Sequence, residues 1–321
     1  MTIYSIQYLR AIAALMVAAN HVFAYPYDIE TGEQGVDIFF VISGFIILYI
    51  MEKNQRTYGK FLMSRFFRIA PLYYLITLFA IIIGFIDFPN LLHSLQAITF
   101  IKFYKTSPPL AVGWTLEYEF IFYSLCSFSI LIFSKQNIRI ILILVMLLCA
   151  VILIDFVIFS EKKYGHFAEF GFGIIIYLIY RLEFFKRINH IYYIFLALTG
   201  FFLLIYTDIA IYKNNFTYLR FVYWGVPSFL IVLSLLLIED KIFQSKFLLY
   251  LGNASYSIYL THLPTIYIFE SIFSYDKYNS FFIWQIFIFI LVVLFACFIH
   301  TFVEKPIANF IKIKFDKKIL S

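Results

Sequence analysis

The stretch SIQYLRAIAALMVAANHVFAY, residues 5–25, is an apolar run that holds one arginine and one histidine. A helix of about 20 residues crosses the hydrocarbon core of a bilayer, because each residue adds about 1.5 Å. This run is long enough to do so, and similar runs recur along the chain. It therefore predicts an integral membrane protein. Arg10 and His21 are both costly in lipid and are expected to serve a function.

The composition also favours a membrane location. Of the 321 residues, 63% are hydrophobic and only 14% are charged, whereas soluble domains are about half apolar and about a quarter charged. One soluble core does not bury a surplus of this size, so lipid is the expected solvent. The net charge of +6 is assigned to cytoplasmic loops, which argues against a nucleic-acid partner.

The three cysteines lie inside apolar segments, at spacings that do not resemble a metal-binding motif. They are Cys126, Cys149 and Cys297. We expect them to be small core residues, with no disulfide and no metal site.

Apolar runs of spanning length predict an all-α fold, a polytopic membrane bundle of about ten transmembrane helices that forms one domain over residues 1–321. The expected spans are 5–25, 35–52, 68–87, 114–134, 138–159, 166–181, 188–208, 219–239, 248–273 and 281–303. Between the third and fourth of these, residues 88–113 contain Pro89, Pro108 and Pro109. This segment is expected to be an outer loop that is partly re-entrant.

The distribution of basic residues predicts the orientation. With the N-terminus inside, 18 of the 25 Lys and Arg residues fall on the inner side and 7 on the outer side. The first outer loop carries Asp28, Glu30 and Glu33 and no Lys or Arg. The positive-inside rule therefore predicts a multi-pass protein of the plasma membrane with both termini in the cytoplasm.

Arg10 and His21 are eleven residues apart in the first expected span. That spacing puts both side chains on one face of a helix, roughly 16 Å apart along its axis. Arg10 lies near the cytoplasmic end and His21 lies toward the outer leaflet. The alternative is that Arg10 reaches the inner interface and His21 lies in the outer headgroup zone.

The second span opens with GVDIFFVISGF, which puts Asp37 near its outer end. Because the first two spans are antiparallel, Asp37 and His21 are expected at a similar depth. A carboxylate bound to one imidazole nitrogen fixes the tautomer and leaves the other nitrogen to act as a base. The alternative is that Asp37 caps the second helix at its N-terminus.

The sequence KFLMSRFFRIAP, residues 60–71, leads into the third span. Its Arg65 and Arg68 are one helical turn apart, on a face expected just below the membrane. Two guanidinium groups in that position suit a phosphate-rich ligand from the cytosol. The alternative is ordinary positive-inside flanking.

Further polar residues lie in the fourth, sixth and ninth spans. WTLEYEFIFY, residues 114–123, brings Glu119, and as a second candidate Glu117, into the outer half. HFAEFGFG contributes His166 and Glu169, and LGNASYSIYLTH contributes Ser255, Tyr256, Tyr259 and His262. Singly, each is explained by interhelical hydrogen bonding.

Together these residues form a pattern. The acid–base groups His21, Asp37, Glu119 and His262 are expected in the outer half, and the cations Arg10, Arg65 and Arg68 at the inner end. This polarity predicts an anionic donor that enters from the cytosol and chemistry that is delivered toward the outside.

Five motifs occur in order between residue 5 and about residue 306: Arg-x10-His, GVDxFFVISGF, RxxRIxP, WTLxxExxFY and GxxSYxIYLxH. The set resembles the acyltransferase family 3 membrane enzymes. The resemblance implies a ten-span protein that moves an acyl group, usually acetyl, from acyl-CoA to a sugar across the membrane. Thr115 and Ile121 depart from the family pattern. The chain ends at Ser321 and resembles the members without a hydrolase-like C-terminal domain.

The resemblance also implies roles for residues. The catalytic candidates are His21, Asp37 and Glu119, and the candidates for binding acetyl-CoA as co-substrate are Arg10, Arg65 and Arg68. Candidates for binding the acceptor are Trp114, Tyr123, Ser255, Tyr256 and His262. The implied partners are acyl-CoA, a carbohydrate or lipid-linked glycan, and membrane lipids.

Residues and resemblance agree on a mechanism in which His21, oriented by Asp37, deprotonates an acceptor hydroxyl that attacks the thioester. An acyl-histidine intermediate is the alternative route. Glu119 is expected to bind the sugar, orient His21 or share the proton. A proton-coupled transporter or glycan exporter is the alternative function, because intramembrane His, Asp and Glu also build proton relays.

Overall fold

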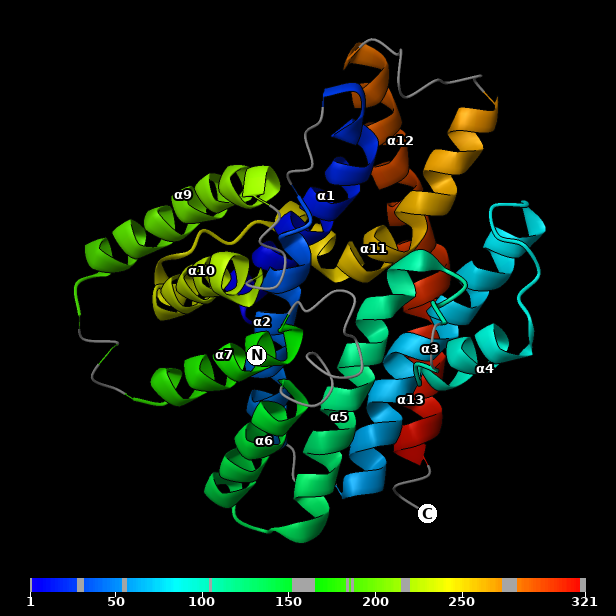
Figure 1. Ribbon diagram of the computed structural model, residues 1–321. Coiled ribbons are helices and arrows are strands. Elements are labelled where there is room, and N and C mark those ends of the chain that lie inside the picture. Colours follow the sequence, from blue (N-terminus) through cyan, green and yellow to red (C-terminus); the bar gives the residue numbers. More distant parts are fainter. Residues whose placement is uncertain are drawn as a thin grey trace. The chain divides into compact units, whose positions relative to one another are not determined.

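The computed structural model describes residues 2–27, 32–53, 57–103, 106–151, 165–182, 185, 188–214, 220–272 and 282–317. All regular secondary structure in these ranges is helical (Figure 1), which confirms the predicted all-α class. The α-helices are α1 (Tyr4–Tyr27), α2 (Gly35–Lys53), α3 (Tyr58–Ile82), α4 (Leu91–Thr99), α5 (Trp114–Ile132), α6 (Gln136–Ala150), α7 (His166–Tyr180), α9 (His190–Asn214), α10 (Val226–Leu237), α11 (Lys246–Ile272), α12 (Phe282–Ile299) and α13 (Lys305–Lys317).

Four short helical segments complete the order. The 3₁₀ segments are η1 (Ala111–Gly113) and η5 (Glu239–Lys241). The π-helical segments are η4 (Phe221–Gly225), directly before α10, and η6 (His300–Glu304), which joins α12 to α13. Segments of π-helix inside α-helices occur frequently at functional sites.

The predicted membrane character is supported, but the count of ten spans is not confirmed. Within the described ranges, six helical stretches are long and apolar enough to cross a bilayer: Tyr4–Phe23, Gly35–Lys53, Tyr58–Ile82, Ala111–Ile132, His190–Thr207 and Phe282–Lys314. Three shorter apolar helices are Gln136–Ala150, His166–Tyr180 and Phe221–Leu237. A helix lies at each of the ten expected positions, although residues 152–164 lie outside the described part of the chain.

The third span differs from its predicted bounds. The helix begins at Tyr58 rather than at residue 68, so Arg65 and Arg68 lie well inside α3. The sequence suggested a later start because the helix opens with polar and basic residues, which extend it beyond its apolar part.

The segment expected as an outer loop contains the short helix α4. The side chain of Asn90 caps its N-terminus by accepting a hydrogen bond from the His93 N–H, and Phe100 ends it in the left-handed conformation. The Tyr74 hydroxyl donates to the Ile98 carbonyl at 2.6 Å, which ties α4 to α3 (Figure 1).

The chain divides into two compact units. The first comprises Met1–Ala13, Glu33–Phe61 and Ile121–Gly252, and the second comprises Ala14–Gly32, Leu62–Phe120 and Asn253–Ser321. The helices α1, α3, α5 and α11 each contribute residues to both units.

In the first unit, α2 and α7 approach closely at two glycines. A Cβ added at Gly44 would lie 2.2 Å from the carbonyl oxygen of Phe170, and one added at Gly173 would lie 2.2 Å from that of Val41. Small residues at such crossings let helix backbones touch, which is a main source of packing energy in membranes. The pair α2–α7 is therefore fixed by backbone contact.

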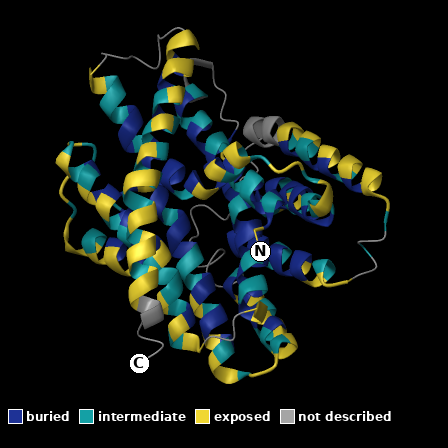
Figure 2. Ribbon diagram, turned by 180° about the vertical axis from the view of Figure 1, so that it is seen from behind, coloured by how far each residue is buried: buried dark blue, intermediate teal, exposed yellow. Residues whose placement is uncertain are grey.

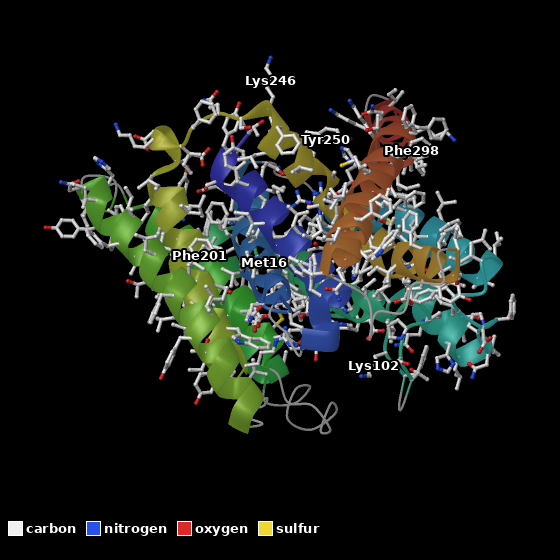
Figure 3. The ribbon with its side chains drawn as sticks, turned by 90° about the horizontal axis from the view of Figure 1, so that it is seen from above. Met16, Lys102, Phe201, Lys246, Tyr250 and Phe298 are labelled. Atoms are coloured by element: carbon white, nitrogen blue, oxygen red, sulfur yellow. The ribbon has the colours of Figure 1, made fainter. Side chains whose placement is uncertain are left out.

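The first unit also holds the N-terminus of α1. The backbone N–H groups of Tyr4 and Ser5 donate to the two carboxylate oxygens of Glu239 at 2.6 and 2.8 Å. These N–H groups have no partner within the helix itself, and a carboxylate at a helix N-terminus is stabilising. Nearby, α11 begins at Lys246, whose side chain extends away from the ribbon (Figure 3).

In the second unit, apolar side chains pack α1, α11 and α12 together. Val22, Ile266, Ile288 and Val292 form a buried cluster. The rings of Phe79 and Phe295 stack at 6.2 Å and join α3 to α12. Many residues of α12 and α13 are exposed along the helix that leads to the C-terminus (Figure 2). Several of them, such as Ile283, Leu294 and Phe310, are apolar, as expected for a face that meets lipid.

The contact between α2 and α7 can be tested with glycine substitutions. Gly173→Ala adds a methyl group where the backbone of α2 leaves no space, so we expect a large loss of folded protein after extraction in detergent. Gly171→Ala, on the same helix, meets nothing within 4 Å and is expected to leave the yield and the unfolding temperature unchanged or slightly raised. Equal effects of the two substitutions would contradict the close approach.

The anchoring of α1 can be tested at Glu239. We expect Glu239→Ala to lower the stability by about 1 kcal/mol, because two N–H groups of α1 lose their acceptor. The measurement is the apparent unfolding temperature of the purified protein. The exposed neighbour Asp240 provides the control, and Asp240→Ala is expected to have no effect. Unchanged stability of the Glu239 variant would argue against the anchor.

Candidate functional site

The predicted site residues divide between the two units. The second unit contains His21, Arg65, Arg68, Trp114, Glu119, Ser255, Tyr256 and His262, and the first contains Arg10, Asp37 and Tyr123. The second unit therefore holds the candidate catalytic histidine, two of the candidate cations and most candidate acceptor contacts. The expected hydrogen bond between His21 and Asp37 joins residues of different units and stays a prediction.

The tautomer of His21 follows from its backbone contact. Its Nδ1 lies 2.9 Å from the carbonyl oxygen of Val17, one helical turn earlier. A carbonyl oxygen only accepts, so Nδ1 carries the proton and donates it to this bond. The other ring nitrogen, Nε2, is then left with a lone pair, and the half-buried side chain can use it as a base.

His262 lies beside His21. The two ring centroids are 4.9 Å apart, with the ring planes at 52°. The Nδ1 of His262 lies 3.3 Å from the carbonyl oxygen of Ile258, so this ring also keeps its lone pair on Nε2. His262 is fully buried, and its Nε2 has no hydrogen-bond partner among the described residues. The structure thus pairs two imidazoles of the same tautomer.

A hydroxyl network adjoins His262. The ring of Tyr259 lies 6.0 Å from that of His262. Its hydroxyl contacts the Thr115 hydroxyl at 3.0 Å and donates to the Val112 carbonyl at 3.1 Å. Thr115, one of the two departures from the motif pattern, makes this contact through its hydroxyl. The departure therefore keeps the polar group.

The two glutamates of α5 occupy different environments. Glu117 is buried and accepts a hydrogen bond from the amide nitrogen of Gln96 in α4. Glu119 is partly exposed and lies within electrostatic range of Tyr256. Glu119 is thus the more accessible carboxylate, as its predicted role requires.

Tyr256 lies at the centre of a second polar group in the same unit. Its hydroxyl donates to the carbonyl oxygen of Ile69 at 2.8 Å. Glu119, Glu304 and Arg68 all lie within electrostatic range of it. A predicted acidic residue and a predicted cation thus both influence this tyrosine electrostatically.

Glu304 organises a neighbouring contact that the sequence did not predict. Its Oε2 accepts from the Ser257 hydroxyl and from His300 Nδ1, each at 2.7 Å. His300 and Glu304 are the first and last residues of the π-helical segment η6. The spacing of four residues between a histidine and a glutamate was the available signal.

The remaining predicted residues have simpler environments. The guanidinium of Arg10 donates to Gln7 Oε1 at 3.5 Å. Trp114 packs edge-on to Tyr118, with the ring centroids 6.0 Å apart. Tyr123 is buried. Ser255 is also buried, and its hydroxyl has no hydrogen-bond partner in the described part of the chain.

Asp37 has a partner that the sequence analysis missed. Arg220, immediately before η4, donates from Nε to Asp37 Oδ1 at 3.2 Å and from Nη2 to Oδ2 at 2.9 Å. Both side chains are buried. Asp37 lies in the first turn of α2, which agrees with the alternative that it serves the N-terminal end of that helix. An arginine on the predicted outer side, where basic residues are rare, was the available signal.

Two more buried polar residues adjoin this pair in the first unit. His166 Nδ1 lies 3.3 Å from Glu169 Oε2 in the first turn of α7. Asp37, His166 and Glu169 could each offer a ligand atom to a metal ion, and these atoms lie within 4.8 Å of one another. The guanidinium of Arg220 already engages both oxygens of Asp37, so a cation would compete with a fixed positive charge. We interpret the group as an ion-pair cluster, and the expectation of no metal site stays a prediction.

The arrangement in the second unit suits acid–base chemistry. It offers two imidazole nitrogens with free lone pairs, hydroxyl groups beside one of them, and a carboxylate and a guanidinium within electrostatic range of Tyr256 on α11. Such a set can remove a proton from a hydroxyl and can return it to a leaving group.

Comparisons with known proteins agree with this chemistry. The family model described as an acyltransferase domain matches residues 3–302. The exopolysaccharide production protein ExoZ of Rhizobium meliloti is 37% identical over 119 residues, which are 34% of this chain and 37% of that protein. The peptidoglycan O-acetyltransferase OatA of Listeria monocytogenes is 32% identical over 155 residues, or 41% of this chain and 24% of that protein.

A third relative covers more of the chain. The putative acetyltransferase ORF330 of Acidianus two-tailed virus is 29% identical over 280 residues, which are 79% of this chain and 81% of that protein. No solved structure matches the chain. Because the family model spans nearly the whole sequence, the chain belongs to acyltransferase family 3.

Proposed function

We propose that the protein is a membrane O-acyltransferase that moves an acetyl group from cytosolic acetyl-CoA to a hydroxyl of a cell-surface or lipid-linked sugar. The observation that carries the proposal is the pair His21 and His262, whose Nδ1 atoms are bound to backbone carbonyls so that each Nε2 is a base. Family membership supports acyl transfer, and the two bacterial relatives support a polysaccharide acceptor.

In the proposed reaction, His21 Nε2 removes the proton of the acceptor hydroxyl while its oxygen attacks the thioester carbonyl carbon. The carbon–sulfur bond breaks, and the proton on His21 passes to the CoA thiolate. The products are the ester and free CoA, with no net proton change. The Nδ1–H bond to Val17 supports this role, because it stays in place while Nε2 gains and loses a proton.

The alternative route uses His21 as an acyl carrier. In that route Nε2 attacks the thioester, and the acceptor hydroxyl then attacks the acyl-imidazole. His262 would be the base in the second step, since its own Nε2 is a lone pair beside the ring of His21.

The donor is proposed to bind through its phosphates at Arg65 and Arg68, while Arg10, which belongs to the first unit, stays a candidate cation. The layout of α11 supports this: Tyr256, within electrostatic range of Arg68, and His262 are six residues apart. That spacing is a rise of roughly 9 Å along the helix. An extended pantetheine arm can bridge such a distance from the cationic end to the histidines.

The other predicted residues are proposed to serve the acceptor. Glu119 would accept a hydrogen bond from a sugar hydroxyl, since it is the more exposed of the two glutamates of α5. The aromatic and hydroxyl side chains that we propose to line the acceptor site are Trp114, Ser255, Tyr256 and His262, while Tyr123 of the first unit stays a candidate. The proposed setting is the plasma membrane with both termini in the cytoplasm, which the excess of inner basic residues supports.

The catalytic role can be tested at His21. We expect His21→Ala to reduce acetyl transfer from acetyl-CoA to the cell-surface glycan at least about 100-fold, because the base is lost. The measurement is the acetyl ester content of the glycan in cells that produce equal amounts of each variant. His190→Ala, at an exposed histidine that begins α9, is the matched control. Normal acetylation by the His21 variant would refute the assignment.

The donor site can be tested at the two arginines of α3. We expect Arg65→Ala/Arg68→Ala to raise the KM for acetyl-CoA roughly 10-fold or more with a smaller change in kcat, because charge-assisted contacts to phosphate are lost. Lys60→Ala removes an exposed cation from the same helix and serves as the control. If both variants raised the KM equally, general attraction rather than a specific site would explain the effect.

A further inference from the structure

We propose that Arg220 and Asp37 form a buried ion pair that holds the segment around η4 against α2 and α7, and that Asp37 serves the protein through this pair. For activity, this inference rests on the proposed acyl transfer. Arg220 is absent from the five motifs that define the family resemblance, and nothing in the comparisons assigns it a role.

Arg220 and Asp37 meet in a two-point contact. Two parallel donors of one guanidinium meet the two oxygens of one carboxylate, at 3.2 and 2.9 Å. The side chain of Arg220 is 6% exposed and that of Asp37 is 0% exposed. A two-point contact of this kind fixes both planes and uses one acceptor position on each oxygen of Asp37.

The guanidinium of Arg220 makes further hydrogen bonds besides those to Asp37. Arg220 Nη1 donates to Glu33 Oε2 at 3.0 Å, and Nη2 also donates to the Glu33 carbonyl at 3.2 Å. The ring of Trp224 lies 4.3 Å from the guanidinium carbon. With donors on all three nitrogens in use, Arg220 is poorly suited to bind an anionic substrate. Its contacts instead join segments of the protein to one another.

The position of the ion pair in the fold follows from the elements that hold Asp37 and Arg220. Asp37 is in the first turn of α2, which is held against α7 by the contact at Gly44. Arg220 directly precedes the π-helical segment η4. A Cβ added at Gly225, the end of η4, would lie 3.1 Å from the Glu169 side chain of α7. The ion pair therefore joins η4 and α10 to the rigid pair α2–α7.

Removing one member of the ion pair and removing both members are expected to change the stability differently. Removing one member of a buried ion pair leaves an uncompensated charge and is strongly destabilising. Replacing both members with neutral residues of similar volume is often tolerated, because the cost of burying charge disappears as well. A base or an orienting carboxylate behaves differently, since no change at Arg220 can restore a carboxylate that has been removed from Asp37.

The experiment is a cycle of three variants: Asp37→Asn, Arg220→Gln and the double variant. Each is purified from membranes in detergent, and its unfolding temperature and its transfer of acetyl from acetyl-CoA are measured. We expect each single variant to lose folded yield and activity at least 10-fold, and the double variant to recover both to within a few-fold of the unchanged protein. The apolar double variant Asp37→Leu/Arg220→Met tests the same point without hydrogen bonding.

The surface ion pair of Glu52 and Arg181 is the matched control. Its partners are 3.3 Å apart but 39% and 40% exposed, and it lies in the same unit. The corresponding cycle of Glu52→Gln and Arg181→Gln should show no resolvable shift in unfolding temperature, because exposed ion pairs contribute little. Equal shifts in unfolding temperature in both cycles would overturn the proposal, because the buried pair of Asp37 and Arg220 would then contribute no more than an exposed one.

Three further outcomes of the experiment bear on the proposal. A double variant that folds but stays as inactive as Asp37→Asn would overturn the proposal, because Asp37 would then act in the chemistry. Failure of both double variants to recover any stability would also overturn it. If the unchanged protein transferred no acetyl group, the proposed function would fail, whereas recovery of stability in the cycle would still support the ion pair.

Discussion

Polar groups buried among apolar helices have no water to satisfy them, so each must find its partner inside the protein. This constraint accounts for the positions of the chemically important residues. His21 binds the carbonyl oxygen of Val17, Asp37 binds Arg220, and Glu117 accepts from Gln96. The same bond that satisfies His21 also sets its tautomer. A structural requirement of the membrane thereby prepares a base for chemistry.

The constraint is met to different degrees within each unit. In the first unit, Asp37 and Arg220 are paired with each other and lie next to helices in backbone contact, so they stabilise a fixed arrangement. Buried polar atoms without a hydrogen-bond partner among the described residues occur in both units, for example the Ser228 hydroxyl in the first and His262 Nε2 and the Ser255 hydroxyl in the second. Such atoms are costly and call for an explanation such as a ligand or a catalytic role. At His262 and Ser255, the proposed reaction supplies one.

The sequence predicted the features that depend on local pattern. Apolar runs located the helices, and the motif order led to the correct family. The bounds of α3 were wrong because its first turns are polar and basic, which a search for apolar runs omits. The ten expected spans include helices such as α11, which is not among the six stretches that meet both criteria for a span. Its length is sufficient to cross a bilayer, but its polar residues make it less apolar.

Partners distant in sequence could not be predicted in the same way. Asp37 and Arg220 are separated by 183 positions, and no local period links them. The contact of His21 with His262 likewise depends on the packing of α1 against α11, although both residues were singled out as costly in lipid. The sequence identifies residues that need partners, whereas the fold decides which partners they receive.

In the proposed reaction, the histidine pair of the second unit moves an acyl group from CoA to a hydroxyl. The most direct measurement follows free CoA thiol and sugar ester together in time, with purified protein, acetyl-CoA and a polysaccharide fragment. We expect thiol and ester to appear at a ratio of one to one, and neither to appear at a comparable rate without the acceptor. Thiol release without ester, or movement of the glycan across a vesicle membrane without consumption of acetyl-CoA, would contradict it.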